Sequence, residues 1–535
     1  MAWFKRHYLF LIVCSVAFFL RFTYLSYSDY QGDEIKALYL PEPGQKLTSY
    51  LLDQRKGPVQ FLVTAAIKPL TSNYTNHFVT RLPFALAGFF GVVFLFKFAE
   101  LHWGKKVAFF AAMFVATNGF FVALARIVQY QSFVIMFMAL ALWLFSLAVK
   151  ERSWRTKGLY FGFIAWTFSL LAHYDGVFIA PFVFYLLIEW FKAPDFTLKS
   201  KIKLFAGSIV LPAILIFSFY IPFALTISGD TKSYWAGRFT GVAGKISSSK
   251  YLFSVYNPLF VFKIYLGLGI LGISKLVLLL FNGRAPFKKL TFIKDPLLGR
   301  DFWLLVWFTL TIVFMEVIVS LPGTHIFTYL FSLAIILGLG IVFSEVILTS
   351  ILSKISKAKF KIGKTFNISF LLGLALLFSY LTTQAYAVYV EHGHEYPWLN
   401  EKYLGLTLYR PSTVYHLSMF GFPYYRHWDE IGKLLATEPG MGFYSTNERV
   451  TISRYYVKLQ KDVDRAGYYV FVINPQSFAQ AITDTKMGNF AKGSKPVATY
   501  YNGDRKVVEI YYRPFAVTGA DKVSSEDKET VEKEN

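Results

Sequence analysis

The sequence predicts a polytopic α-helical membrane protein that carries a small extracytoplasmic α/β domain near its C-terminus. Three observations support this fold class. Hydrophobic residues make up 55% of the 535 residues and charged residues 16%, and the mean hydropathy is +0.43. Apolar segments of membrane-spanning length recur up to residue 390, and a more polar, strand-forming region follows them. Such a composition is typical of a chain that crosses a bilayer several times.

Eleven segments meet the requirement of about 17 to 25 mainly apolar residues for a membrane helix. They are centred on residues 8–25, 80–99, 107–124, 129–149, 158–173, 176–192, 203–226, 258–281, 302–321, 324–348 and 368–390. A twelfth apolar segment, 57–71, is too short to span. We interpret it as a juxtamembrane or re-entrant helix on the outer face.

The distribution of Lys and Arg sets the orientation of these spans. With Lys5 and Arg6 in the cytoplasm, alternate loops carry the basic clusters, as the positive-inside bias requires. These clusters are Lys105 and Lys106; Lys150, Arg152, Arg155 and Lys157; Lys192, Lys199, Lys201 and Lys203; Arg284, Lys288, Lys289, Lys294 and Arg300; and Lys354, Lys357, Lys359, Lys361 and Lys364. Counting 57–71 as a span would invert every later loop. The chain after Val390 is therefore expected outside the cytoplasm. Most of the net charge of +22 is explained by the orientation of the spans in the membrane, so nucleic acid is not an expected partner.

The N-terminus and the cysteine content indicate the compartment. Lys5 and Arg6 precede an apolar run as in a signal peptide, but no small-residue cleavage site follows, which favours an uncleaved anchor. The single cysteine, Cys14, lies in this first span, so an intramolecular disulfide or a cysteine metal site is excluded. Few cysteines and short loops favour the plasma (inner) membrane of a bacterium.

The region after the last span predicts an extracytoplasmic α/β domain over 391–516 and a polar, disordered tail over 517–535. Residues 468–476 and 506–514, rich in β-branched and aromatic residues, are predicted strands, and residues 428–436 and 448–459 are predicted helices.

Charged side chains from distant segments converge on the outer face in this topology. Ionisable groups near membrane depth are costly and are usually functional, so the convergence is the main functional signal. The first of these segments, YSDYQGDEIKALYL at 27–40, places two adjacent carboxylates directly after the first span. The converging residues are Asp29, Asp33, Glu34, Asp53, Arg55, Lys56, Arg126, His173, Asp175 and His325.

Four motifs in this order resemble the lipid-carrier-dependent membrane glycosyltransferases of the GT-C class, in the branch of the protein O-mannosyltransferases and the lipid A aminoarabinose transferases. They are GDEIKALYL after the first span, RKGPVQFLV at 55–63, TRLPFALAG at 80–88 and ARIVQYQSF at 125–133. The resemblance covers about the first 350 residues. It implies a GT-C transmembrane domain over 1–390, with a first outer loop over 26–79 that holds the active carboxylates.

The resemblance implies that Asp33 is the catalytic base and that Glu34 helps to place the acceptor. Attack of a hydroxyl on an anomeric carbon needs proton removal as the bond forms, which one positioned carboxylate can supply. The polyprenyl phosphate leaving group needs charge stabilisation, which Lys56 and Arg126 could provide. For Arg126 the alternative is a guanidinium that snorkels at a helix end.

The chain also departs from the family pattern. Gly57 stands where the family commonly has the first proline of a Pro-Pro pair, and Gln131 stands where it has an aspartate. An amide can hydrogen-bond a sugar or the backbone, but it cannot act as a base.

Further candidates follow the same topology. Asp29, Gln131, His173 and Asp175 are predicted to contact the acceptor or the sugar, although Asp175 could instead cap the next helix. His325 and Tyr329 lie where family members contact the carrier phosphate. Lys263 could bind the donor phosphate or pair with the intramembrane Glu316. No zinc-type spacing is present, and the question of a divalent metal stays open.

These features lead to one main hypothesis and two alternatives. The main one is transfer of a sugar, with inversion, from a polyprenyl-phosphate donor to a hydroxyl acceptor outside the cytoplasm. A polytopic lipid or sugar-lipid flippase would also contain intramembrane charges, but it would not need a base. A non-catalytic protein that binds the sugar lipid would release no carrier phosphate.

Overall fold

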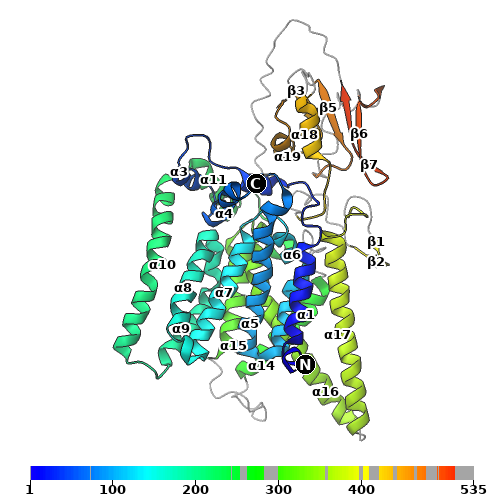
Figure 1. Cartoon of the computed structure of the whole chain (residues 1–535). Helices are drawn as coiled ribbons and strands as arrows, with labels where there is room; N and C mark the ends of the chain where they lie inside the picture. Colours follow the sequence, from blue (N-terminus) through cyan, green and yellow to red (C-terminus); the bar gives the residue numbers. More distant parts are fainter. Residues whose placement is uncertain are drawn as a thin grey trace.

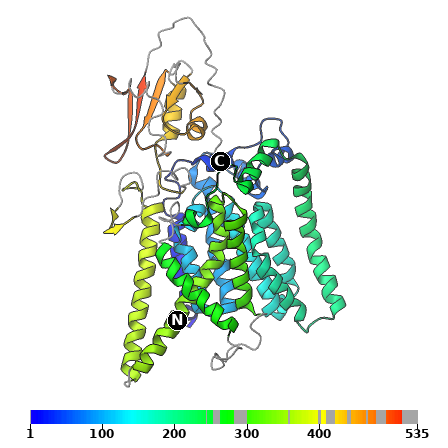
Figure 2. The same ribbon diagram turned by 180° about the vertical axis from the view of Figure 1, so that it is seen from behind.

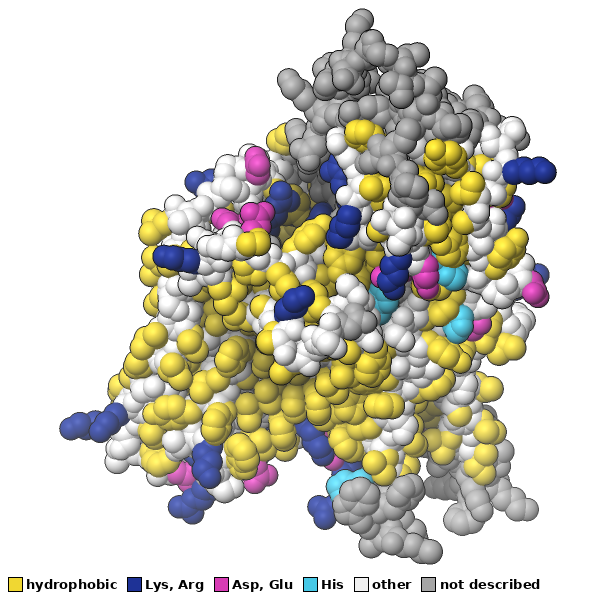
Figure 3. All heavy atoms as spheres, turned by 45° about the horizontal axis from the view of Figure 1, so that its top comes forward, with side chains coloured by type: hydrophobic (Ala, Val, Ile, Leu, Met, Phe, Trp, Pro, Cys, Tyr) yellow, Lys and Arg dark blue, Asp and Glu magenta, His cyan; other side chains and the backbone are white. Residues whose placement is uncertain are grey.

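A computed structural model describes residues 2–72, 74–242, 244–252, 262–281, 299–355, 359–396, 402–408, 421–437, 443–462, 467–476, 491 and 493–512. A bundle of long helices carries a smaller domain with a β-sheet at one end, and the N-terminus lies at the opposite end (Figure 1). On the face that Figure 3 shows, apolar side chains dominate the middle of the bundle, while charged side chains gather toward its two ends. This architecture confirms the predicted fold class.

Within the described residues, seven helical segments are long and apolar enough to cross a membrane, against the eleven spans expected. The bundle consists of α1 (Ala2–Phe22), α5 (His77–Thr117), α7 (Gln131–Lys150), α8 (Lys157–Ala172), α9 (Ala180–Lys192), α10 (Leu198–Thr226), α14 (Phe262–Phe281), α15 (Arg300–Val313), α16 (Phe327–Ile355) and α17 (Lys359–Tyr389). Several of these, such as α8 with 16 residues, are apolar but short of the length criterion.

The long element α5 contains two of the expected spans. At Gly104 the backbone has φ 81° and ψ 172°, a conformation that glycine adopts at little cost. The helix axis is broken there, so the two expected spans at 80–99 and 107–124 correspond to the two parts of α5. Lys105 and Lys106 follow the break, at the end of the bundle that the basic loops occupy.

The helices differ in how deeply they are packed. In the apolar stretch of α16, 83% of the residues are buried, against 11% in α10 and 22% in α17. The helix α16 is thus central, with α5 and α14 packed against it. The helices α10 and α17 stand at opposite edges of the bundle in both views (Figures 1 and 2).

Short helices cover the end of the bundle that carries the sheet domain. The segment predicted as juxtamembrane forms α4 (Val59–Ile67), and α3 (Leu47–Leu52), α6 (Gly119–Ala125) and α11 (Gly229–Thr240) lie toward the same end (Figure 1). The short helix α2 (Gly32–Leu38) contacts α4, and α12 (Ser248–Lys250) follows α11 in the chain. Three irregular helices, η3 (Tyr174–Ile179), η5 (Phe314–Ile318) and η6 (Gly323–Ile326), lie at the ends of longer ones. We call this face the outer end of the bundle.

The smaller domain contains a mixed five-stranded sheet in the order β4-β3-β5-β7-β6. Its strands are β3 (Phe443–Thr446), β4 (Gln460–Lys461), β5 (Tyr468–Val472), β6 (Ala498–Asn502) and β7 (Arg505–Tyr512). Two helices, α18 (Trp428–Thr437) and α19 (Val450–Tyr456), accompany it, and β1 (Lys402–Tyr403) pairs separately with β2 (Leu406–Thr407). The two predicted strands overlap β5 and β7, and the two predicted helices overlap α18 and α19.

Candidate functional site

Glu34 anchors the short helix α2 to the bundle. Its side chain is fully buried. One carboxylate oxygen accepts hydrogen bonds from Arg81 Nε (2.7 Å) and Val128 N (3.0 Å). The other accepts from Arg81 Nη2 (2.9 Å) and from the Gln31 backbone N–H (3.1 Å) as part of a capping box. Both oxygens of this carboxylate are thus occupied by hydrogen bonds within the protein. This arrangement differs from the predicted contact of Glu34 with an acceptor.

Asp33, one residue earlier, points away from this buried network. Its side chain is 72% exposed, and Oδ1 lies 3.7 Å from Lys36 Nζ. Desolvation by the surrounding protein raises its pKa, but nearby cations outweigh that effect and lower the pKa below the usual aspartate value. These cations are Lys56, Lys36, Arg449 and Arg238. Asp33 is therefore an ionised, accessible carboxylate within a group of basic side chains.

Lys56 is held by the loop that connects α6 and α7. Its Nζ donates to Gln129 Oε1 (3.3 Å) and lies 4.8 Å from the centre of the Tyr130 ring. Desolvation lowers the pKa of Lys56, although Asp33 raises it in part. A cation in such poorly hydrated surroundings gains more from an anionic ligand than an exposed lysine does.

The close packing around Gly57 explains why glycine stands at this position instead of proline. A Cβ placed on Gly57 would lie 2.0 Å from the carbonyl oxygen of Leu171. The backbone beside Lys56 therefore contacts the end of α8 directly, and only glycine allows that approach.

Arg238, on α11, belongs to the cationic group although the sequence analysis did not single it out. Its guanidinium lies 4.9 Å from the centre of the Tyr234 ring, and that of Arg55 lies 4.7 Å from the same ring. A helix signal was present: Ser228 caps the N-terminus of α11, and Gly241 ends the helix in a left-handed conformation. Read together, these two residues would have placed Arg238 on a helix at the outer end.

Arg449 reaches the group from the smaller domain. It is the N-cap residue of α19, and its Nη1 lies 3.9 Å from the position that a Cβ on Gly32 would take. Nearby, Tyr456 on the same helix accepts a hydrogen bond from the backbone N–H of Tyr30 (2.9 Å). No local sequence signal connects Arg449 with α2, because the contact depends on how the domain docks.

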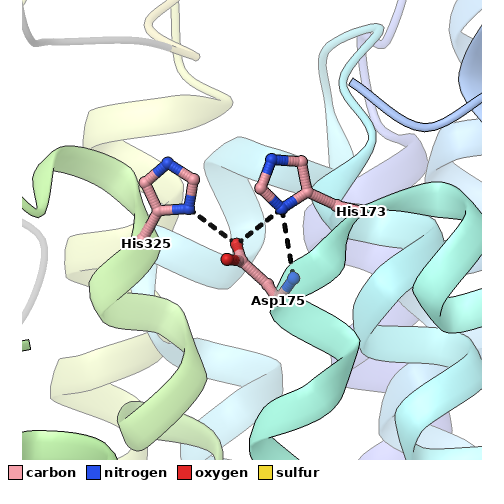
Figure 4. A group of neighbouring side chains, drawn as sticks. All are labelled: His173, Asp175 and His325. Atoms are coloured by element: carbon pink, nitrogen blue, oxygen red, sulfur yellow. Dashed lines mark hydrogen bonds and ion pairs between the residues drawn. The ribbon is translucent and has the colours of Figure 1, made fainter. Parts of the chain in front are cut away.

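Three further predicted residues meet next to Lys56. His173 is the C-cap residue of α8, Asp175 lies in the first turn of η3 and His325 lies in η6. Both imidazole rings turn toward the Asp175 carboxylate (Figure 4). The distances from Asp175 Oδ2 to the ring Nδ1 atoms are 2.7 Å for His325 and 3.2 Å for His173. The Tyr130 ring stacks on His173 at 4.2 Å and 15°. Since Lys56 lies over the same tyrosine, the two groups are contiguous.

Arg126 lies at a helix end, as the alternative reading of the sequence had it. Its guanidinium donates to four backbone carbonyls, those of Leu20 (3.0 Å), Arg21 (3.3 Å), Thr23 (2.8 Å) and Tyr24 (3.2 Å). A cation at the carbonyl end of α1 satisfies unpaired acceptors and complements the helix dipole. The N–H groups of Arg126 are engaged by these carbonyls, so we do not assign Arg126 to the phosphate of the sugar donor.

Asp29 joins the first outer loop to the smaller domain. It is fully buried, its Oδ2 accepts from the Arg426 backbone N–H (2.6 Å), and its own N–H donates to the Tyr424 carbonyl (2.8 Å). The predicted contact of Asp29 with an acceptor or sugar is thus replaced by an interdomain contact. Burial raises the pKa of Asp29 to about 7.

This shift makes the stability of the protein depend on pH. Because the folded-state pKa lies above the unfolded value of 3.8, the folded state binds more protons, and stability falls as pH rises from that value toward 7. We expect Asp29→Asn to be more stable than the wild type at about pH 8, by on the order of a few kcal/mol, and the gap to shrink toward about pH 5. Thermal unfolding in detergent across this range measures it. Asp504→Asn, which changes an exposed carboxylate of the smaller domain, is the control, and a pH-independent gap for Asp29→Asn would contradict the assignment.

The remaining predicted residues are placed as follows. Gln131 is buried and donates to Thr324 Oγ1 (3.3 Å). Tyr329 is buried, and its hydroxyl is hydrogen-bonded to Ser248 Oγ (2.8 Å). Glu316 accepts from the Ser249 N–H (2.9 Å) and hydroxyl (3.0 Å). The side chain of Lys263 lies outside the described residues.

Comparison with known proteins gives matches over part of the chain and in the fold. Residues 55–221 match the model of the dolichyl-phosphate-mannose-protein mannosyltransferase family. No curated protein sequence gives a significant match. The archaeal oligosaccharyltransferase AglB from Archaeoglobus fulgidus, solved with an inhibitory peptide and a dolichol-phosphate, has a TM-score of 0.50 and 13% identity, covering 97% of this chain and 76% of that chain.

Two further solved structures are similar at lower scores. ArnT from Cupriavidus metallidurans, bound to undecaprenyl phosphate, has a TM-score of 0.45 at 13% identity, over 95% of this chain and 98% of that chain. The Pmt1-Pmt2 protein O-mannosyltransferase complex of S. cerevisiae, bound to its sugar donor, has a TM-score of 0.33 at 16% identity, over 43% and 35% of the two chains. The likeness to AglB shows the fold of the present chain.

Proposed function

We propose that this chain, which resembles the GT-C membrane glycosyltransferases of the protein O-mannosyltransferase branch, transfers a sugar from a polyprenyl-phosphate donor to a hydroxyl acceptor. The observation that carries the proposal is Asp33, an accessible carboxylate with a lowered pKa among four cations at the outer end of the bundle. The family match over residues 55–221 supports a transferase. The lipid phosphates in the solved structures of AglB and ArnT support a lipid-linked donor.

The chemistry follows from the arrangement of charges. The acceptor oxygen attacks the anomeric carbon, and its proton passes to Asp33 as the new C–O bond forms. The bond to the phosphate oxygen breaks on the opposite face, so the configuration inverts. Lys56 and Arg238 stabilise the negative charge that develops on the departing polyprenyl phosphate. Glu34 acts by fixing α2, which positions Asp33.

The same proposal includes the location of the reaction. The basic loops favour a cytoplasmic N-terminus, and the smaller domain lies at the other end of the bundle (Figure 1). The donor, the acceptor and the smaller domain would then meet on the outer face of a bacterial plasma membrane. The acceptor hydroxyl belongs to a protein, a lipid or a glycan of the cell envelope.

The direct test is release of the carrier phosphate. The full chain, reconstituted in nanodiscs, is supplied with a polyprenyl-phosphate sugar and a set of hydroxyl acceptors. The proposed function predicts stoichiometric formation of polyprenyl phosphate and glycosylated acceptor. A flippase would move the intact donor between leaflets of a vesicle without cleaving it, and a binding protein would retain it unchanged. Either result would contradict the proposal.

Lys56 provides a sharper test of the phosphate site. Lys56→Met keeps much of the aliphatic stem but removes the cation, and a hydrogen bond to a charged group contributes about 1.5–3 kcal/mol. We expect affinity for the polyprenyl phosphate to fall by roughly 10- to 100-fold. The exposed Lys46 in the same outer loop gives the control, Lys46→Met. Equal affinities of the two variants would remove Lys56 from the donor site.

A further inference from the structure

His173, Asp175 and His325 present three potential metal ligands from two separate parts of the chain. Their ligand atoms all lie within 4.8 Å of one another. His173 and Asp175 are buried, and the side chain of His325 is 13% exposed. Figure 4 shows both rings directed at one carboxylate oxygen. The convergence is close enough for a single ion to contact all three.

The hydrogen bonds around His173 Nδ1 are not all satisfied at once. His173 Nδ1 accepts a hydrogen bond from the backbone N–H of Asp175 (3.2 Å), so this nitrogen carries no proton. The same nitrogen faces Asp175 Oδ2 at 3.2 Å, which places two acceptor atoms against each other in a buried site. If Nδ1 were protonated instead, it would oppose the Asp175 N–H. Buried polar groups rarely remain in such a conflict. A cation bound to Oδ2 would offset the repulsion between the two acceptors, and it would take Nδ1 as a ligand only if the Asp175 N–H gave up that nitrogen.

The distances also fit a metal ion. A tetrahedral Zn²⁺ site has metal–ligand bonds of about 2.0–2.2 Å to imidazole nitrogen and carboxylate oxygen, so its ligand atoms lie roughly 3.3–3.5 Å apart. The observed nitrogen–oxygen distances of 2.7 and 3.2 Å are shorter, so a bound ion would hold these ligand atoms several tenths of an ångström further apart. Two imidazoles and one carboxylate suit a divalent transition metal and leave at least one coordination position open.

We propose that His173, Asp175 and His325 bind one divalent transition metal ion. The stacking of Tyr130 between His173 and Lys56 puts this site next to the lysine. A ligand for the open position would be an anionic oxygen such as that of a phosphate; this clause rests on the proposed function, whereas metal binding itself does not.

The experiment measures metal content without any sugar donor. The full chain in detergent is stripped with a chelator, loaded with Zn²⁺ or Co²⁺, desalted and analysed by mass spectrometry of its metals. We expect one bound ion per chain, and for Co²⁺ a visible d–d spectrum of nitrogen and oxygen ligation. Asp175→Asn and His325→Gln should lower the affinity by about 100-fold or more, since loss of a second-shell partner alone costs 10- to 100-fold.

Controls separate this inference from misfolding and from the proposed function. His427→Asn removes a histidine of the smaller domain that is bonded to Asn502 and should keep the ion. The Co²⁺ spectrum of the wild type needs no variant, so it decides the point even where a variant fails to fold. A wild type that binds no ion, or variants that bind as the wild type does, would overturn the metal site. Metal binding without release of carrier phosphate would contradict the proposed function alone.

Discussion

Asp33→Asn is expected to reduce sugar transfer by about a hundredfold or more while leaving donor binding nearly unchanged. Asparagine preserves the size of the side chain and part of its hydrogen bonding, but it cannot accept the acceptor proton. General-base catalysis contributes about 10²- to 10⁴-fold, and Glu34, the adjacent carboxylate, is engaged in its buried ion pair with Arg81. Turnover per folded molecule, measured by release of carrier phosphate, gives the result.

A second carboxylate of the same loop supplies the matched control for this prediction. Asp53 is exposed, and its Oδ2 accepts from Gln45 Nε2 at 3.4 Å, so Asp53→Asn should retain wild-type turnover. Normal turnover in Asp33→Asn would remove the base role from Asp33. Lower yield or thermal stability with normal turnover would instead assign Asp33 a structural role.

Glu34→Gln is expected to produce the largest loss of stability. It leaves the guanidinium of Arg81, which is 2% exposed, without its counter-ion in the interior. Breaking one partner of a buried ion pair costs about 3–5 kcal/mol. Unfolding in mixed micelles measures the change, and Asp33→Asn, one residue away but exposed, should leave stability almost unaffected.

The double variant Glu34→Gln, Arg81→Met completes this experiment. If the pair acts as a unit, the double variant loses less stability than the sum of the two single variants. A stable Glu34→Gln protein with strongly reduced transfer would contradict this structural role of Glu34. Glu34 would then contact the acceptor, as the resemblance to the family implies.

The sequence contained enough information for the bundle and for the face that carries the site. Apolar length and the basic loops placed Asp33, Lys56, His173 and His325 at one end, because both signals depend on local composition. The interruption of α5 at Gly104 also had a local signal, because the two lysines that follow it indicated a loop between two spans. The expected number of spans exceeded the number that the described residues support, because short apolar helices such as α8 fall below the length criterion.

The roles of individual charged residues could not be read from the sequence. Asp33 and Glu34 are adjacent, and successive residues of a helix project about 100° apart, but nothing in the motif tells which one faces inward. Arg126 has a side chain suited to bind phosphate, but its nearest acceptors are carbonyls at the end of α1, about 100 residues earlier in the chain. Arg449 required knowledge of domain docking, which no local pattern encodes.

The contacts of residues 28–30 with the smaller domain have a consequence for biosynthesis. Ser28, Asp29 and Tyr30 bond to partners at 422–426 and 456, which lie 394 to 426 positions later. A ribosome makes the carboxylates first and these partners near the end. During synthesis and membrane insertion, a nascent chain therefore holds Asp33 without Arg449 and without the backbone pairing that fixes its loop. Lys56 and Lys36 are made together with the carboxylate, but the group of cations is complete only once the last domain has folded against the bundle. An unfinished or truncated chain therefore lacks part of the site that the proposed transfer requires.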